Sequence, residues 1–138
     1  MKIYFSGSIR GGRENVEIYR ELIEYLNQNN EVLTKHIGDK DLSVDGQTEL
    51  SDAEIRKRDI DWMKEADLVI AETSNPSLGV GYELAYAEKI NKPVLILHNK
   101  RTKLSAMING TEYFKDINYY SSIEEARHIL GEKVQNYL

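Results

Sequence analysis

The stretch that decides the fold is residues 68–88, LVIAETSNPSLGVGYELAYAE. Its first four residues are all apolar, which is typical of a buried β-strand, and residues 84–88 are typical of a helix. A loop rich in Ser and Gly joins the two segments and ends at Glu83. Small residues in such a loop let a ligand approach the backbone closely, and the N–H groups at a helix start favour an anion such as a phosphate.

Strand-like and helix-like segments alternate on both sides of this stretch. Short apolar runs predict strands at 2–5, 31–34, 67–72, 93–97 and, at one edge, 117–120. Apolar residues at three- and four-residue spacing predict helices at 14–29, from 51 to about 66, at about 79–90 and at 121–137, with a short helix at 104–108. The polar residues 38–50 predict a surface loop. The alternation predicts an α/β fold with three layers: an about five-stranded, mostly parallel sheet with helices on both faces, in a single domain over 1–138.

Composition excludes several classes of function. The chain has 138 residues and a net charge of −5, so it lacks the basic surface that a nucleic acid polymer or an anionic membrane would need. It has no cysteine, and its three histidines show no metal-ligand spacing, so we expect no metal site. No apolar run approaches a membrane span or a signal-peptide core, which predicts a cytoplasmic protein.

The loop 6–13, SGSIRGGR, follows the first strand as the Ser- and Gly-rich loop follows the third. In parallel sheets, ligands bind outside the C-terminal ends of the strands, so both loops can reach one site. The loop is neither a Walker A motif nor a Rossmann fingerprint. The guanidinium of Arg10 suits a terminal phosphate, while a solvated turn with a surface arginine is the alternative.

Two carboxylates and two aromatic side chains are further candidates. Asp59 lies on the apolar side of its predicted helix and Glu83 near the start of another, so the pair could divide nucleophile and acid roles at an anomeric carbon. The alternative is that Asp59 reaches solvent and that Glu83 only complements the helix dipole. Tyr4 could orient a carboxylate or be a core residue, and His36 could contact a ligand.

Five ordered motifs carry a resemblance to a known family. They are YFSGSIRGGRE (4–14), RDIDW (58–62), ADLVIAE (66–72), PSLGVGYEL (76–84) and LSAMI (104–108). The set resembles the 2′-deoxynucleoside 5′-phosphate N-hydrolases, which belong to the nucleoside 2-deoxyribosyltransferase superfamily. The resemblance implies a flavodoxin-like or Rossmann-like α/β fold, a homodimer, and cleavage of the N-glycosidic bond of a deoxynucleoside monophosphate without a cofactor.

The resemblance also implies a role for individual residues. Glu83 matches the carboxylate that attacks C1′ and forms a glycosyl–enzyme intermediate, Asp59 matches the acid that assists the leaving base, and Tyr4 matches a tyrosine beside the catalytic carboxylate. His36 matches a residue near the base. Ser105 matches a phosphate contact from the neighbouring subunit. The 5′-phosphate cradle is matched by Ser8, Ile9, Arg10, Gly11, Ser77 and Gly79.

Alternative functions share these residues. A nucleoside 2-deoxyribosyltransferase would form the same intermediate and resolve it with a second base. Transferases that act on unphosphorylated nucleosides typically carry an aspartate at the position of Ser77, and a serine there favours a nucleotide. A ribonucleotide N-hydrolase of the CMP type is a second alternative. A nucleotide-binding sensory module without chemistry is a third.

Overall fold

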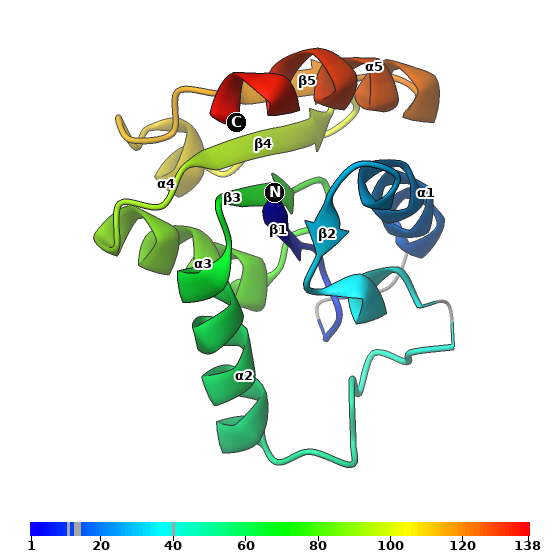
Figure 1. Ribbon diagram of the computed structural model, residues 1–138, viewed down its shortest axis with the longest axis vertical. Helices are drawn as coiled ribbons and strands as arrows, with labels where there is room; N and C mark the ends of the chain where they lie inside the picture. The colour runs from blue at the N-terminus through cyan, green and yellow to red at the C-terminus, as the bar shows by residue number, and fades with distance from the viewer. Residues whose placement is uncertain (11, 13–14, 40) are drawn as a thin grey trace.

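A computed structural model describes residues 1–10, 12, 15–39 and 41–138 of the chain (Figure 1). The described part contains one sheet of five parallel strands in the order β2-β1-β3-β4-β5. The strands are β1 (Lys2–Ser6), β2 (Glu31–Val32), β3 (Leu68–Glu72), β4 (Val94–Asn99) and β5 (Ile117–Tyr120). The predicted α/β fold with a parallel sheet is therefore confirmed. The single domain stays a prediction.

The helices follow the predicted order, with shifts at their ends. They are α1 (Val16–Asn27), α2 (Asp52–Glu65), α3 (Leu78–Lys89), α4 (Ala106–Asn109) and α5 (Ile123–Lys133), with 3-10 turns η1 (Lys35–Gly38) and η2 (Val134–Tyr137). The predicted strand 31–34 is shorter than expected because the Thr34 hydroxyl takes over its pairing. Thr34 Oγ1 donates to the Phe5 carbonyl (2.6 Å) and accepts from the Phe5 N–H (2.9 Å).

The sheet separates two apolar cores, as the two-residue alternation of its strands requires. On one face, Ile3 and Phe5 of β1 pack with buried residues of α1 and α5. On the other face, Tyr4 packs with buried residues of α2 and α3. Helices thus cover both faces of the sheet, which gives the three predicted layers (Figure 1).

The strand order places a crevice at the C-terminal ends of β1 and β3. The chain goes from β1 to β2 on one side and reaches β3 on the other side, so the loops after β1 and β3 diverge, and such switch points are where ligands bind in open α/β sheets. A capping box at Ser51 and Glu54 fixes the start of α2. Segment 41–51 leads from the η1 side of the sheet to α2 (Figure 1). Within the described ranges, no helix has the length and apolar character needed to cross a bilayer.

Candidate active site

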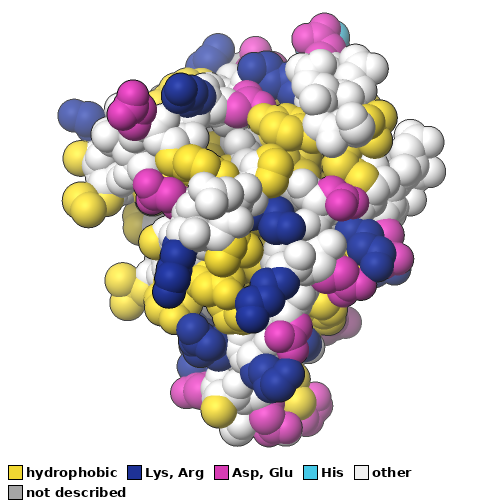
Figure 2. Space-filling view, turned by 60° about the vertical axis from the view of Figure 1, so that its left-hand side comes forward, with side chains coloured by type: hydrophobic (Ala, Val, Ile, Leu, Met, Phe, Trp, Pro, Cys, Tyr) yellow, Lys and Arg dark blue, Asp and Glu magenta, His cyan; other side chains and the backbone are white. Residues whose placement is uncertain are grey.

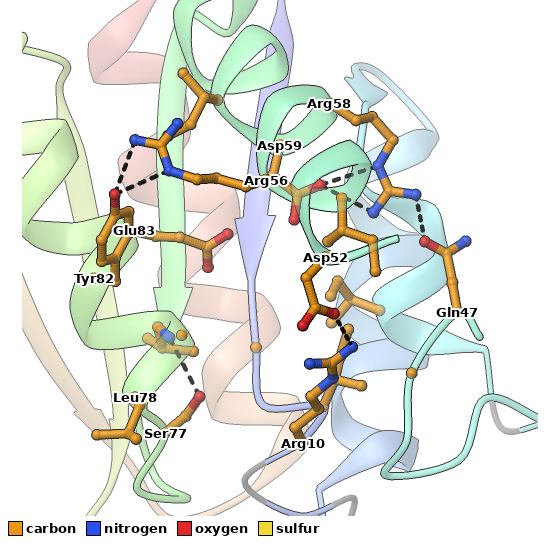
Figure 3. Close-up of a pocket in the computed structure, with 18 residues that line it drawn as sticks. Arg10, Gln47, Asp52, Arg56, Arg58, Asp59, Ser77, Leu78, Tyr82 and Glu83 are labelled. Atoms are coloured by element: carbon orange, nitrogen blue, oxygen red, sulfur yellow. Dashed lines mark hydrogen bonds and ion pairs between the residues drawn. The ribbon is translucent and has the colours of Figure 1, made fainter. Parts of the chain in front are cut away.

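A cavity of about 610 Å³ occupies this crevice, between the loop after β1, segment 41–51, α2 and α3 (Figure 3). Glu83 and Asp59 lie toward one end, where Arg56 and Arg58 also lie. Ser77 and Arg10 lie toward the other end, with Asp52 beside Arg10. The Glu83–Asp59 carboxylate pair and the N-terminus of α3 therefore lie at opposite ends of one cavity. The predicted site residues that line it are Ile9, Arg10, Asp59, Ser77, Gly79 and Glu83.

Strand β1 holds both oxygens of the Glu83 carboxylate. The Tyr4 hydroxyl donates to Oε2, and the Ser6 hydroxyl donates to Oε1 over 2.7 Å. Tyr4 and Ser6 are two residues apart on a strand, so both side chains leave the sheet on the side where α3 packs. Ser6 was not among the predicted site residues. Its two-residue spacing from Tyr4 is the signal that could have identified it.

The surroundings of Glu83 bring its ionisation into the neutral range. Burial raises the pKa of the carboxyl from 4.5 to about 7, with a further contribution from the negative charge of Asp59. The hydrogen bonds from Tyr4 and Ser6 favour the ionised form and partly oppose this rise in pKa. At neutral pH a substantial fraction of Glu83 is therefore an ionised, hydrogen-bonded carboxylate, as a nucleophile must be.

Asp59 reaches the cavity from the middle of α2. Its side chain is 21% exposed, and Arg58 donates to its Oδ1 through Nε (3.1 Å) and Nη2 (3.0 Å). Burial raises the pKa of the Asp59 carboxyl, and the charge and hydrogen bonds of Arg58 only partly oppose it. Asp59 therefore holds a proton at higher pH than an exposed aspartate does, which suits a general acid.

The guanidinium of Arg58 has partners on several sides. Its Nη1 donates to the side-chain oxygen of Gln47, Nη2 lies 3.4 Å from His36 Nε2, and its Cζ lies 4.6 Å from the centre of the Trp62 ring. His36 is thus placed beside Arg58 and is not part of the cavity lining. Arg58 and Gln47 were not predicted as site residues, although Arg58 is adjacent to Asp59 and one helical turn before Trp62.

The other end of the cavity carries hydrogen-bond donors. Ser77 caps the N-terminus of α3, where its Oγ accepts from Val80 N over 3.2 Å. Arg10 comes from the loop after β1 and forms an exposed ion pair with Asp52 (2.8 Å). A helix N-terminus close to an arginine is a suitable place for a phosphate group.

Two more predicted residues, Ser8 and Ser105, are not part of the cavity lining. Ser8 is buried, and Asn75 Nδ2 donates to its Oγ over 3.2 Å, which links the loops after β1 and β3. Ser105 is exposed at the N-cap of α4 and does not line the cavity. Gly11 lies outside the described residues.

Comparison with known proteins places this chain among related sequences. Residues 3–127 match the family model described as nucleoside 2-deoxyribosyltransferase. A 5-hydroxymethyl-dUMP N-hydrolase of Danio rerio is 46% identical over 112 residues, 80% of this chain and 78% of that protein. A candidate 2′-deoxynucleoside 5′-phosphate N-hydrolase of Nematostella vectensis is 47% identical over 119 residues, 83% of this chain and 80% of that protein.

Solved structures show the same fold at lower identity. A CMP N-glycosidase of Clostridium botulinum superposes with a TM-score of 0.70 at 21% identity, covering 100% of both chains. A 2-deoxyribosyltransferase of Bacillus psychrosaccharolyticus superposes with a TM-score of 0.67 at 18% identity, covering 92% of this chain and 90% of its own.

Proposed function

This chain belongs to the nucleoside 2-deoxyribosyltransferase family, and from that membership and the cavity we propose that it hydrolyses 2′-deoxynucleoside 5′-monophosphates at the N-glycosidic bond. The products are a free nucleobase and 2-deoxyribose 5-phosphate. The observation that carries the proposal is one cavity with a carboxylate pair, Glu83 and Asp59, toward one end and Arg10 with the α3 N-terminus toward the other. The N-hydrolase names of the relatives support the same reaction.

The phosphate end positions the substrate. Ser77 and Gly79 at the start of α3 and the guanidinium of Arg10 would bind the 5′-phosphate, with Ser8, Ile9 and Gly11 completing the loop after β1. A carboxylate at position 77 would repel a phosphate, and the serine can donate to it. Binding energy gained at the phosphate, remote from C1′, helps to orient the sugar against Glu83.

The carboxylate end performs the chemistry. Glu83 attacks C1′ while the C1′–N bond breaks, and the electron pair of that bond leaves with the base, which takes the proton of Asp59. The resulting glycosyl ester is then attacked at C1′ by water, which gives a proton to the Asp59 carboxylate, and Glu83 leaves as a carboxylate. Tyr4 holds Glu83 in place. The missing 2′-hydroxyl of deoxyribose makes the cationic character at C1′ less costly.

In this proposal the enzyme is a homodimer, and each chain contributes a residue to the active site of the other. Ser105 lies outside the cavity of its own chain, and as part of a homodimer it would reach the phosphate of the neighbouring site. Support comes from large apolar side chains left exposed on α3 and α4: Leu78 is 96% exposed and Met107 80%. Figure 2 turns this side toward the viewer and shows hydrophobic side chains at its surface. The proposed location is the cytoplasm, where nucleoside monophosphates are retained by their charge.

A panel of deoxy- and ribonucleoside monophosphates, with the matching nucleosides, tests the proposed reaction. Base release followed by chromatography should be fastest with a deoxynucleoside monophosphate, and the Glu83→Ala variant should lose almost all of it while keeping its fold. Comparable rates with nucleosides would contradict the phosphate assignment, and wild-type rates in Glu83→Ala would contradict the nucleophile.

A second free base in the same reaction separates the hydrolase from a transferase. The proposed hydrolase yields 2-deoxyribose 5-phosphate whether or not the second base is present. A new nucleotide as the main product would instead establish base exchange. Tight nucleotide binding without base release would establish a binding module.

A further inference from the structure

We propose that Arg58 is a positioning residue for the acid Asp59, holding one carboxylate oxygen so that the other faces the leaving base, with Gln47 as its anchor. The inference rests on the proposed function, because it assumes that Asp59 protonates the base. It adds a residue and a loop contact to which the motifs assign no role.

Arg58 donates hydrogen bonds to only one of the two Asp59 carboxylate oxygens. Nε and Nη2 both donate to Oδ1, at 3.1 and 3.0 Å, and none of the described residues donates a hydrogen bond to Oδ2. Figure 3 shows Arg58 on one side of the Asp59 carboxylate, and both residues line the cavity. One oxygen is therefore fixed by the protein and the other is left for a ligand.

Arg58 is itself held, so it can fix Asp59. Its guanidinium packs on Trp62, which is one helical turn further along α2, and its Nη1 donates to Gln47 of segment 41–51. The Arg58 side chain is only 22% exposed. A planar guanidinium with fixed neighbours on its face and edge loses little conformational freedom when it binds a carboxylate. Gln47 makes this geometry depend on segment 41–51 as well as on α2.

Arg56 is an arginine near the cavity that makes no contact with Asp59. It lies two residues earlier on α2, lines the same cavity and is exposed. Its Nε and Nη2 donate to the Tyr82 hydroxyl, at 3.1 and 2.8 Å, and it has no carboxylate partner among the described residues. Arg56 therefore carries the same charge near the cavity without contacting the acid, and it is the matched control.

The contact between Arg58 and Asp59 affects the pH range of the reaction. The ionisable groups that face Asp59 or its partner are Tyr4 of β1, Glu83 of α3, His36 of η1 and Arg58 itself. Arg58 is the cation in direct contact with Asp59 and favours its ionised form. Without Arg58, Asp59 should keep its proton to higher pH, and it should no longer be held in one orientation.

The test measures kcat/KM and kcat from about pH 5 to about pH 9 for wild type, Arg58→Gln, Arg58→Lys and Arg56→Gln. One deoxynucleoside monophosphate serves for all four, so the titration of its phosphate near pH 6 is common to every profile. Arg58→Gln should move the high-pH limb up by about one pH unit and lower kcat at the optimum. Arg58→Lys should return the limb toward wild type but not kcat, because an ammonium cannot place two fixed N–H groups on one oxygen. The Arg56→Gln limb should match wild type.

Two results would overturn the inference. One is a high-pH limb of Arg58→Gln that coincides with wild type although kcat falls. The other is an equal shift in Arg56→Gln, which would mean that any nearby cation has the effect. A carbon-13 NMR titration of Asp59 in wild type, Arg58→Gln and Arg58→Lys needs no turnover. The pKa of Asp59 should rise in Arg58→Gln and stay near the wild-type value in Arg58→Lys. If Arg58→Gln fails to fold, a kcat of Arg58→Lys equal to that of wild type would refute the inference. If the wild type releases no base, the proposed function fails, and this titration alone decides the Arg58 contact: a pKa of Asp59 unchanged in Arg58→Gln would refute it.

Discussion

Replacing Glu83 by Gln should stabilise the fold above neutral pH while it stops base release. Burial raises the pKa of the Glu83 carboxyl from 4.5 to about 7. Below about pH 4.5 the group is protonated in both the folded and the unfolded chain. Between these two values the folded chain keeps a proton that the unfolded chain has released, so the free energy of unfolding falls as pH rises. Above about pH 7 the free energy of unfolding falls no further. A glutamine does not ionise, so the variant does not lose this stability.

The size of the effect follows from the same interval. At about 1.4 kcal/mol per pH unit, the range from 4.5 to about 7 corresponds to at most about 3 kcal/mol. Glutamine has one side-chain oxygen in place of two, so one of the hydrogen bonds from Tyr4 and Ser6 has to rearrange, at a cost of about 1 kcal/mol. We therefore expect Glu83→Gln to gain about 2 kcal/mol at pH 8 and to lose this advantage near pH 5.

Urea unfolding of both proteins at pH 5 and pH 8 measures this difference. Glu88→Gln is the control, because Glu88 is exposed on the same helix and its substitution should change stability little at either pH. A stability difference between Glu83→Gln and wild type that is the same at pH 5 and pH 8 would refute the reasoning. So would a variant that is less stable than wild type at pH 8.

Three further substitutions test the rest of the site. Arg10→Ala should raise KM for the monophosphate about tenfold and leave KM for the matching nucleoside unchanged, and equal losses on both would contradict a phosphate contact. Asp52→Asn should lower KM for the monophosphate about twofold at low salt, because it releases Arg10 from an exposed ion pair, and no change would mean that the pair does not compete with substrate. Tyr4→Phe removes a donor from Glu83, so the pKa of that carboxyl should rise and the low-pH limb of kcat/KM should move upward with a lower kcat. An unmoved limb would argue that Tyr4 serves packing alone.

The sheet could be predicted from the sequence because its strands are short apolar runs between helical patterns. Leu68–Glu72 of β3 is buried throughout, as a central parallel strand has to be. The second strand was predicted too long because the propensities of residues 31–34 do not reveal that Thr34 bonds the backbone of β1. That contact joins residues 29 positions apart, and spacing rules describe only local neighbours.

The cavity was only partly predictable, for the same reason. The motifs contain Asp59 and Glu83, but their pKa values are raised by burial, and the hydrogen bonds that partly oppose this rise come from β1 and from Arg58. Ser6 could have been found from its spacing relative to Tyr4. Gln47 could not, because it lies in an irregular polar segment and meets Arg58 only after α2 has packed on the sheet.

The hydrogen bonds between Glu83 and β1 determine which part of the molecule can move during a catalytic cycle. A carboxylate bonded through both oxygens to a strand with neighbours on either side stays where the sheet puts it. The nucleotide therefore has to travel to the carboxylate, and the base has to leave past walls that are not part of the sheet. Two walls have no regular secondary structure: residues 7–10 after β1, and segment 41–51, which contacts α2 through Gln47. We expect any motion that admits the nucleotide or releases the base to occur in these walls, while the strand that holds Glu83 stays fixed.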